Sequence, residues 1–297
     1  MRDDPLQPVP WTRMEELLEK LLSDVPNSLT VYGMVQTALL WKQTEVSHRF
    51  GMYTTSDRFD GAAIVGIFKI SDSHDYRVTV YCFGEDTSML QEALLRTNRI
   101  KWNLPESTIF FTAIPEKLLP VVQRCVSGQG FGIVQTENIV YQWKTPDHLN
   151  SLNYSCPPEV RVAPLGLEYV ELIRKNWSNL PASAEYIETL IKQNINLGVY
   201  SRATGELCAW VLCNEFCALT MMHTMENHRR KGYAQLLCNA MSERLLRAGI
   251  IARAVVMEEN RPSLKLFESH KFRSSRDFFV YVLAMPRRAV DSGQWEI

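Results

Sequence analysis

Three basic residues crowd the start of a predicted helix, where cations are unfavourable. In the stretch ENHRRKGYAQLL, residues 226–237, Arg229, Arg230 and Lys231 directly precede Gly232. The first turn of a helix carries partial positive charge and unpaired N–H groups, so it favours anions. A bound anion would resolve the conflict, and a pyrophosphate suits three cations beside exposed N–H groups better than a single carboxylate does. The apolar positions that predict the amphipathic helix are Tyr233, Leu236, Leu237, Ala240, Met241 and Leu245.

Two common phosphate-binding signatures are absent. Lys231 precedes Gly232 and no Ser or Thr follows, which disfavours the G-x-x-x-x-G-K-[ST] loop of P-loop NTPases. The dinucleotide signature G-x-G-x-x-G is also missing, and the predicted elements do not alternate regularly between strand and helix. The alternative interpretation of the cations is a solvated charged face. Their position at a helix start argues against it.

The loop resembles a known cofactor-binding motif. Arg229, Gly232 and Ala234 fit the pattern [RQ]-x-x-G-x-[GA], which resembles the acetyl-CoA loop of the GCN5-related N-acetyltransferase (GNAT) superfamily. Downstream, NRPSLKLFESHKF resembles the segment N-x-x-A-x-x-L-Y-x-x-x-G-F of that superfamily. The matching positions are Asn260, Leu266 and Phe272, and the departures are Ser263, Phe267 and Lys271. NSLTVYG, RKNWSN, GVYSRATGELCAWVL and HTMENHRRKGYA further resemble the glycine N-acyltransferase family, over most of the chain.

This resemblance implies that acetyl-CoA or another acyl-CoA binds as acyl donor. Backbone N–H groups of the loop would hold the pyrophosphate. The strand before the loop, residues 219–225, would splay from the strand at 252–258, and the pantetheine arm would pair with its open edge. The implied cofactor-binding residues are Thr224, Met225, Arg229, Arg230, Lys231, Gly232, Tyr233, Ala234 and Asn260.

The implied reaction moves the acyl group to the amine of a small acceptor such as glycine or another amino acid. The amine must be neutral, so a general base should lie near the thioester, and a backbone N–H should face the carbonyl oxygen. His223 is one candidate catalytic base, and Glu215 is another that would act through water. The glutamate that the family is thought to use has no match, because Cys217 and Ala218 occupy the nearest places. Phe267 replaces a tyrosine that often serves as general acid.

Other interpretations remain open at this point. His223 fits a hydrogen-bonded structural histidine equally well, and Glu226 fits a loop carboxylate that pairs with the arginines. An amino-acid acceptor requires a cation for its carboxylate, and the candidates are Arg161, Arg174 and Arg253. The alternative functions are a protein or peptide N-acetyltransferase and a non-catalytic CoA-binding module.

The elements that must position the loop indicate an α+β fold with a mixed central sheet flanked by helices. An amphipathic helix at 14–25 precedes predicted strands at 28–35, 61–70 and 76–84. Both halves end in the order strand, loop, helix, strand, helix, strand, which predicts two tandem GNAT-like domains. The predicted parts are a degenerate GNAT-like domain at 1–145, a linker at 146–158, an acyl-CoA-binding GNAT domain at 159–285 and a tail at 286–297.

The first half carries different charges at the corresponding loop. There the strand at 76–84 leads into Glu85 and Asp86, acids that favour a helix start without any ligand and would repel pyrophosphate. We therefore expect this half to lack CoA binding and to border the acceptor pocket.

Composition limits the partners and the compartment. The chain is 46% hydrophobic and 22% charged, with a formal net charge of -1 and dispersed basic residues, so no nucleic-acid partner is expected. No apolar run is long enough to span a membrane, and the N-terminus lacks the features of a signal or transit peptide. Seven scattered cysteines without a C-x-x-C pair favour a reducing compartment and no metal site. An intracellular, cytoplasmic protein is expected, with the mitochondrion left open.

Overall fold

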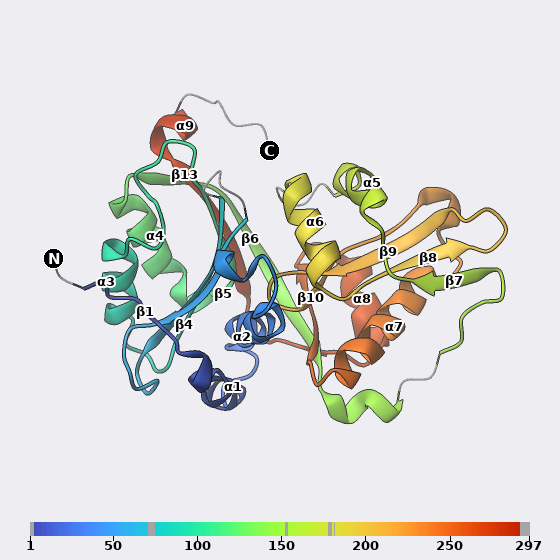
Figure 1. Cartoon of the computed structure of the whole chain (residues 1–297), viewed down its shortest axis with the longest axis horizontal. Coiled ribbons are helices and arrows are strands. Elements are labelled where there is room, and N and C mark those ends of the chain that lie inside the picture. Colours follow the sequence, from blue (N-terminus) through green and yellow to red (C-terminus); the bar gives the residue numbers. More distant parts are fainter. Residues whose placement is uncertain (1–2, 71–74, 152–153, 178–179, 181, 292–297) are drawn as a thin grey trace. The chain divides into compact units, whose positions relative to one another are not determined.

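The chain divides into two compact units. The computed structural model describes residues 3–70, 75–151, 154–177, 180 and 182–291 (Figure 1). One unit comprises Met1–Ile139 with Arg276–Ile297, and the other comprises Val140–Ser275. Each contains a mixed sheet flanked by helices, which confirms the predicted α+β class. Among the described residues, no helix combines the length and the apolar character needed to cross a membrane.

The first unit is built on a sheet in the order β1-β2-β3-β4-β5-β13-β6. Its strands are β1 (Gln7–Pro8), β2 (Phe50–Thr54), β3 (Ala63–Lys69), β4 (Asp75–Cys82), β5 (Thr108–Pro115), β13 (Phe279–Pro286) and the first part of β6 (Phe131–Lys144). Strands β4 and β5 run parallel, and the other neighbours are antiparallel. Its helices are α1 (Met14–Leu22), α2 (Leu29–Trp41), α3 (Ser88–Arg96), α4 (Leu119–Gly128) and α9 (Arg287–Asp291). Side chains of α3 and α4 form one core cluster with β3, β4 and β5.

The strand predicted at 28–35 is wrong, because these residues begin helix α2. Val31, Tyr32 and Val35 favour a strand by composition, since β-branched and aromatic residues are enriched there. Helix α2 packs against α1 on one side and against β2, β3 and β4 on the other. Its residues are therefore buried almost all round, and the amphipathic period that identifies a helix is missing. Strand β2 follows it and was not predicted.

The last strand of the chain belongs to the first unit. Strand β13, dark red in Figure 1, lies between β5 and β6, and Phe279 is opposite both Pro115 and Ile139. The predicted domain boundaries stay a prediction, and these contacts group residues 276–291 with the N-terminal part of the chain. Within the predicted linker, Pro146–Ser151 forms the short 3-10 helix η4. Residues 292–297 of the predicted tail lie outside the described residues.

The second unit has a sheet in the order β11-β10-β9-β8-β7. Its strands are β7 (Val160–Ala163), β8 (Asn196–Ser201), β9 (Leu207–Cys213), β10 (Ala218–Thr224) and β11 (Ala252–Met257), and β12 (Arg273–Ser274) pairs with the end of β6. Strands β7 to β10 are antiparallel, whereas β10 and β11 run parallel. Its helices are α5 (Val170–Lys175), α6 (Ala184–Gln193), α7 (Tyr233–Arg247) and α8 (Arg261–Ser269). All six apolar positions predicted for α7 are buried.

The predicted repetition of element order is confirmed up to the second helix of each half, whereas the last predicted strand of the second half, β13, pairs in the first unit. In the first unit β4 leads through α3, β5 and α4 to β6, and in the second unit β10 leads through α7 and β11 to α8. In each case the helix connects two parallel strands. The loop before that helix is therefore the equivalent position in the two units.

Candidate active site

Strands β10 and β11 pair only at their beginnings within the described residues. Their parallel register contains Ala218 opposite Arg253 and Leu219 opposite Ala254, although β11 continues to Met257. On its other side β10 has an irregularity between Thr220 and His223 in its pairing with β9, and Met221 has a φ of 51°. Beyond Leu219, the edge of β10 that faces β11 consequently keeps backbone groups for another partner.

The loop after β10 ends in a helix start without a cap. The 3-10 helix η6 (Glu226–His228) leads to Arg230 and Gly232, whose φ angles of 62° and 80° are left-handed. Helix α7 then begins at Tyr233, with no side-chain cap at Gly232 and no acid in its first turn. Its first helical bond runs from Leu236 N to Gly232 O at 3.0 Å, so the three N–H groups before Leu236 have no partner within the helix.

In the equivalent helix of the first unit, an acid accepts a hydrogen bond from the first backbone N–H. Asp86 Oδ1 accepts a hydrogen bond from the backbone N–H of Ser88 at 2.9 Å, and Oδ2 accepts one from the Ser88 hydroxyl at 3.0 Å. These bonds lower the pKa of Asp86. One loop thus carries a carboxylate at the helix start, and the other carries cations at the same place.

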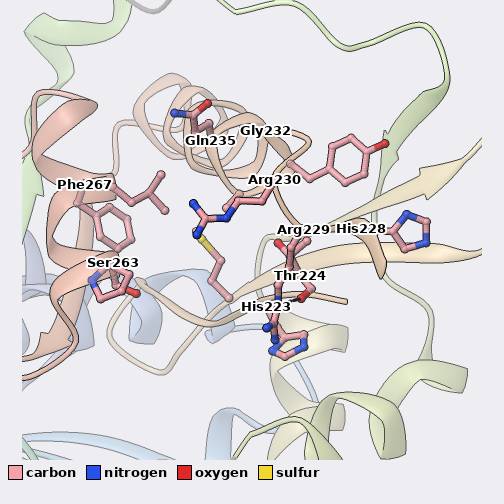
Figure 2. A pocket seen from close by; sticks show the side chains of 14 residues that line it. His223, Thr224, His228, Arg229, Arg230, Gly232, Gln235, Ser263 and Phe267 are labelled. Carbon is pink, nitrogen blue, oxygen red and sulfur yellow. Dashed lines mark hydrogen bonds between the residues drawn. The ribbon is translucent and has the colours of Figure 1, made fainter. Parts of the chain in front are cut away.

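A pocket of about 710 Å³ opens at the start of α7 (Figure 2). It is lined by Met222, His223, Thr224, His228, Arg229, Arg230, Gly232, Tyr233, Ala234, Gln235, Pro262, Ser263, Leu266 and Phe267. The structure therefore brings together seven of the predicted site residues, from His223 to Ala234. The predicted residues outside the lining are Glu215, Met225, Lys231 and Asn260.

Two arginines line this pocket, and Lys231 follows them in the chain. Arg229, Arg230 and Lys231 are exposed, and within the described part of the chain none of them forms an ion pair. Glu226 likewise forms no ion pair with them in the described residues. Arg229 Nε donates to the backbone oxygen of Thr224 at 3.3 Å, whereas Arg230 extends across the pocket (Figure 2). The lining contains no Asp or Glu, so the pocket favours a negatively charged ligand.

His223 is held on an aromatic surface. It is opposite Trp210 of β9, and the two rings stack with centroids 4.9 Å apart and planes at 26°. Burial and then the nearby Arg229 lower the pKa of His223. The imidazole is therefore neutral near neutral pH and can accept a proton, as a general base must. Its catalytic role stays a prediction.

The other candidate base, Glu215, is placed differently. It is buried with 1% of its surface exposed, and it lies outside the pocket lining. Its carboxylate accepts a hydrogen bond from the Tyr186 hydroxyl at 2.5 Å. This contact joins the turn between β9 and β10 to helix α6, a structural role that the burial of Glu215 explains.

Removing this hydrogen bond is expected to destabilise the second unit without affecting the pocket. Tyr186→Phe leaves a buried carboxylate short of a donor, which should lower the free energy of unfolding by about 1–3 kcal/mol. Tyr154→Phe is a matched control, because Tyr154 donates to Glu243 at 2.6 Å but the Glu243 side chain is 30% exposed and also pairs with Arg247. Urea unfolding should rank Tyr186→Phe as the costlier change, and equal losses would contradict the structural role.

The three arginines proposed for an acceptor carboxylate have other contacts. Arg161 lies over the Tyr200 ring at 4.5 Å, and Arg174 pairs with Glu171 at 2.8 Å. Arg253 is fully buried and its Nε donates to Ile251 O at 3.1 Å. All three are outside the pocket lining. The cations that line the pocket are instead those of the loop before α7.

Sequence reasoning did not predict several lining residues. Met222, His228 and Gln235 come from the segments already singled out, and His228 Nε2 lies 3.6 Å from Glu206. Helix α8 contributes Pro262, Ser263, Leu266 and Phe267. Their helical spacing of three and four residues is the signal that could have identified this face. Asn260, predicted to contact the cofactor, caps α8 by accepting a hydrogen bond from Ser263 N at 3.2 Å.

Comparisons with known proteins agree with this geometry. Residues 196–280 match the family model described as FR47-like protein, and residues 5–125 match a domain of unknown function, DUF5645. Human glycine N-acyltransferase-like protein 2 is 21% identical over 279 residues, which cover 88% of this chain and 92% of the relative.

Solved structures share the fold over both units. A Drosophila protein has a TM-score of 0.80 at 22% identity, covering 95% of this chain and 99% of its own. A GCN5-related N-acetyltransferase from Sphaerobacter thermophilus has a TM-score of 0.53 at 14% identity, covering 96% of each chain. The chain is similar over most of its length to a glycine N-acyltransferase-like protein, and it shares its fold with solved structures that include a GCN5-related N-acetyltransferase.

Proposed function

We propose that this protein is an acyl-CoA-dependent N-acyltransferase that moves an acyl group from acetyl-CoA or a longer acyl-CoA to the amine of a small acceptor, such as glycine or another amino acid. One observation carries the proposal. The uncapped, acid-free start of α7 and the unpaired edge of β10 border the same cation-lined pocket. A ligand whose diphosphate lies at the start of α7, whose amide-bearing arm lies along β10 and whose reactive end lies in the pocket fits this arrangement.

The residues present fit the cofactor. The free N–H groups of Tyr233, Ala234 and Gln235 and the Arg230 guanidinium would hold the diphosphate, because charge-assisted hydrogen bonds to phosphate are strong. Lys231 is exposed next to them and would add long-range attraction. The open edge of β10, up to Thr224, would bond the pantetheine amides, whereas the backbone N–H of Met225 already donates to Cys208 O of β9 at 2.9 Å. When bound, the cofactor supplies an acyl group activated as a thioester.

His223 would prepare the acceptor for attack. Its neutral ring can accept a proton from the ammonium group of the acceptor, and stacking on Trp210 fixes the plane of the ring. The unpaired N–H groups of β10 beyond Leu219 can stabilise charge that develops on a carbonyl oxygen. The alternative general base, Glu215, would act on the acceptor through a water molecule. Its burial and its hydrogen bond to Tyr186 disfavour this role.

The pocket supports a small acceptor over a basic peptide. A lysine-rich peptide would find no Asp or Glu among the pocket-lining residues. An amino acid brings a carboxylate, which is compatible with the surplus of cations. The relative named glycine N-acyltransferase-like protein 2 points to the same class of acceptor. The cytoplasmic location, with the mitochondrion as the alternative, stays a prediction.

Release of free thiol from a panel of acyl-CoAs and acceptors tests the proposal. The panel combines acetyl-CoA and longer acyl-CoAs with glycine, other amino acids and basic peptides. We expect turnover with amino acids. Turnover with peptides alone would support the protein N-acetyltransferase, and thermal stabilisation by CoA without turnover would support the non-catalytic module. If CoA does not stabilise the protein and no acceptor is turned over, all three candidate functions are rejected.

A further inference from the structure

Helix α8 presents a single polar side chain to the pocket. Ser263 and Phe267 are one turn apart on the same wall (Figure 2). Phe267 is 4% exposed and packs edge to face on Phe272, with centroids 5.1 Å apart. The other lining residues of α8, Pro262 and Leu266, are apolar. Within the described lining, Ser263 is thus the one side chain of α8 that can donate a hydrogen bond.

The Ser263 hydroxyl is available for a ligand. The residue is partly exposed, and its backbone N–H is already bonded to Asn260 Oδ1 at 3.2 Å. In the described part of the chain, its Oγ has no hydrogen-bond partner. It also lies in the first turn of α8, where partial positive charge favours an anion. A hydroxyl with these properties on the wall of a pocket is suited to donate a hydrogen bond to an atom of the ligand.

The proposed reaction creates an atom that accepts hydrogen bonds strongly. When the acceptor nitrogen has bonded to the acyl carbon, the carbon–sulfur bond breaks and its electron pair stays on sulfur as a thiolate. Hydrogen bonds to charged groups are stronger than neutral ones, so a donor at this sulfur would lower the barrier more than it tightens ground-state binding. Phe267 offers no such donor.

We propose, on the basis of the proposed function, that Ser263 is a catalytic residue that donates a hydrogen bond from Oγ to the leaving sulfur. The hydroxyl keeps its proton throughout. His223 takes the first proton from the acceptor ammonium and passes it to solvent, and it takes the second proton from the same nitrogen as the amide forms. The thiolate is released or takes a proton from water. Ser263 therefore stabilises the leaving group without acting as a general acid.

The ionisation of bound CoA tests this inference without turnover. Thiolate absorbance is titrated for CoA bound to the wild-type protein, to Ser263→Ala and to Ser263→Thr. We expect the acid dissociation constant of the bound thiol to be roughly 10- to 100-fold larger in the wild type than in Ser263→Ala, with Ser263→Thr close to the wild type. The turnover number should fall by a similar factor in Ser263→Ala. Phe267→Tyr in the Ser263→Ala background should restore part of both, because it returns a hydroxyl to the same wall.

The outcomes separate this inference from the proposed function. If CoA binds to both proteins and its thiol ionises identically, Ser263 does not contact the sulfur. A raised KM with an unchanged turnover number would show that the hydroxyl bonds another part of the ligand and would also overturn the inference. Failure of the wild-type protein to bind CoA would overturn the proposed function itself.

Discussion

Replacing Gly232 with aspartate is expected to abolish the thermal stabilisation of this protein by CoA. Gly232 directly precedes α7 with a φ of 80°, and a Cβ added there would meet only Gln235 Oε1, at 3.7 Å. The new carboxylate would therefore reach the unpaired N–H groups of the first turn and repel the diphosphate. A ligand at 100 times its Kd stabilises by about 2.7 kcal/mol, and this whole increment should disappear.

Gly205→Asp is the matched control for this experiment. Gly205 has a φ of 74°, and a Cβ there would meet nothing within 4 Å. It lies in the turn between β8 and β9, outside the pocket lining. Both variants carry the same left-handed strain and the same added charge, so the control should unfold earlier yet keep its response to CoA. A Gly232→Asp protein that CoA still stabilises would contradict the assignment of the loop.

His223→Ala is expected to lower the turnover number by roughly 10²- to 10⁴-fold, the usual contribution of a positioned general base. The variant removes a ring that stacks on Trp210 and lines the pocket. The affinity for CoA, measured by thermal shift, should change much less than the turnover number. Equal losses of CoA binding and rate would indicate that His223 only supports the pocket.

If His223 is the general base, the rate should fall at acidic pH. Burial and Arg229 hold the pKa of His223 below its ordinary value of 6.5. A base acts when neutral, so the rate should fall as pH drops through that lowered pKa and stay level above it. Arg229→Gln removes one cause of the lowering, so the acidic limb should move to higher pH. An acidic limb that persists in His223→Ala and vanishes in His228→Ala would assign the base to the other pocket histidine.

Local sequence patterns predicted most of the second unit but not the shape of its sheet. The apolar spacing after Gly232 predicted α7, and its buried positions agree. The left-handed φ of Met221 and the loss of pairing after Leu219 have no local signature, because they depend on how β9 and β11 meet β10. In the first unit, α2 is covered on two sides, so its sequence lacks the periodicity that distinguishes a helix from a strand.

The lining residues that are close together in the sequence were largely predicted, whereas those contributed by α8 were not. The segment from His223 to Ala234 is one uninterrupted run, and its cations at a helix start are by themselves enough to indicate an anionic ligand. Ser263 and Phe267 are distant in sequence from the loop and carry no charge, so only the packing of α8 shows that they line the pocket. Glu215 satisfied the chemical requirement for a base, but it lies buried against Tyr186.

The position of β13 has a consequence for synthesis of the chain. This strand fills the place between β5 and β6, yet it follows all strands of the second unit along the chain. The nascent N-terminal half must therefore wait with two unpaired strand edges while the whole second unit emerges. A premature stop codon shortly before Phe279 would leave every pocket residue translated and would nonetheless deprive the first unit of the strand that pairs with both β5 and β6.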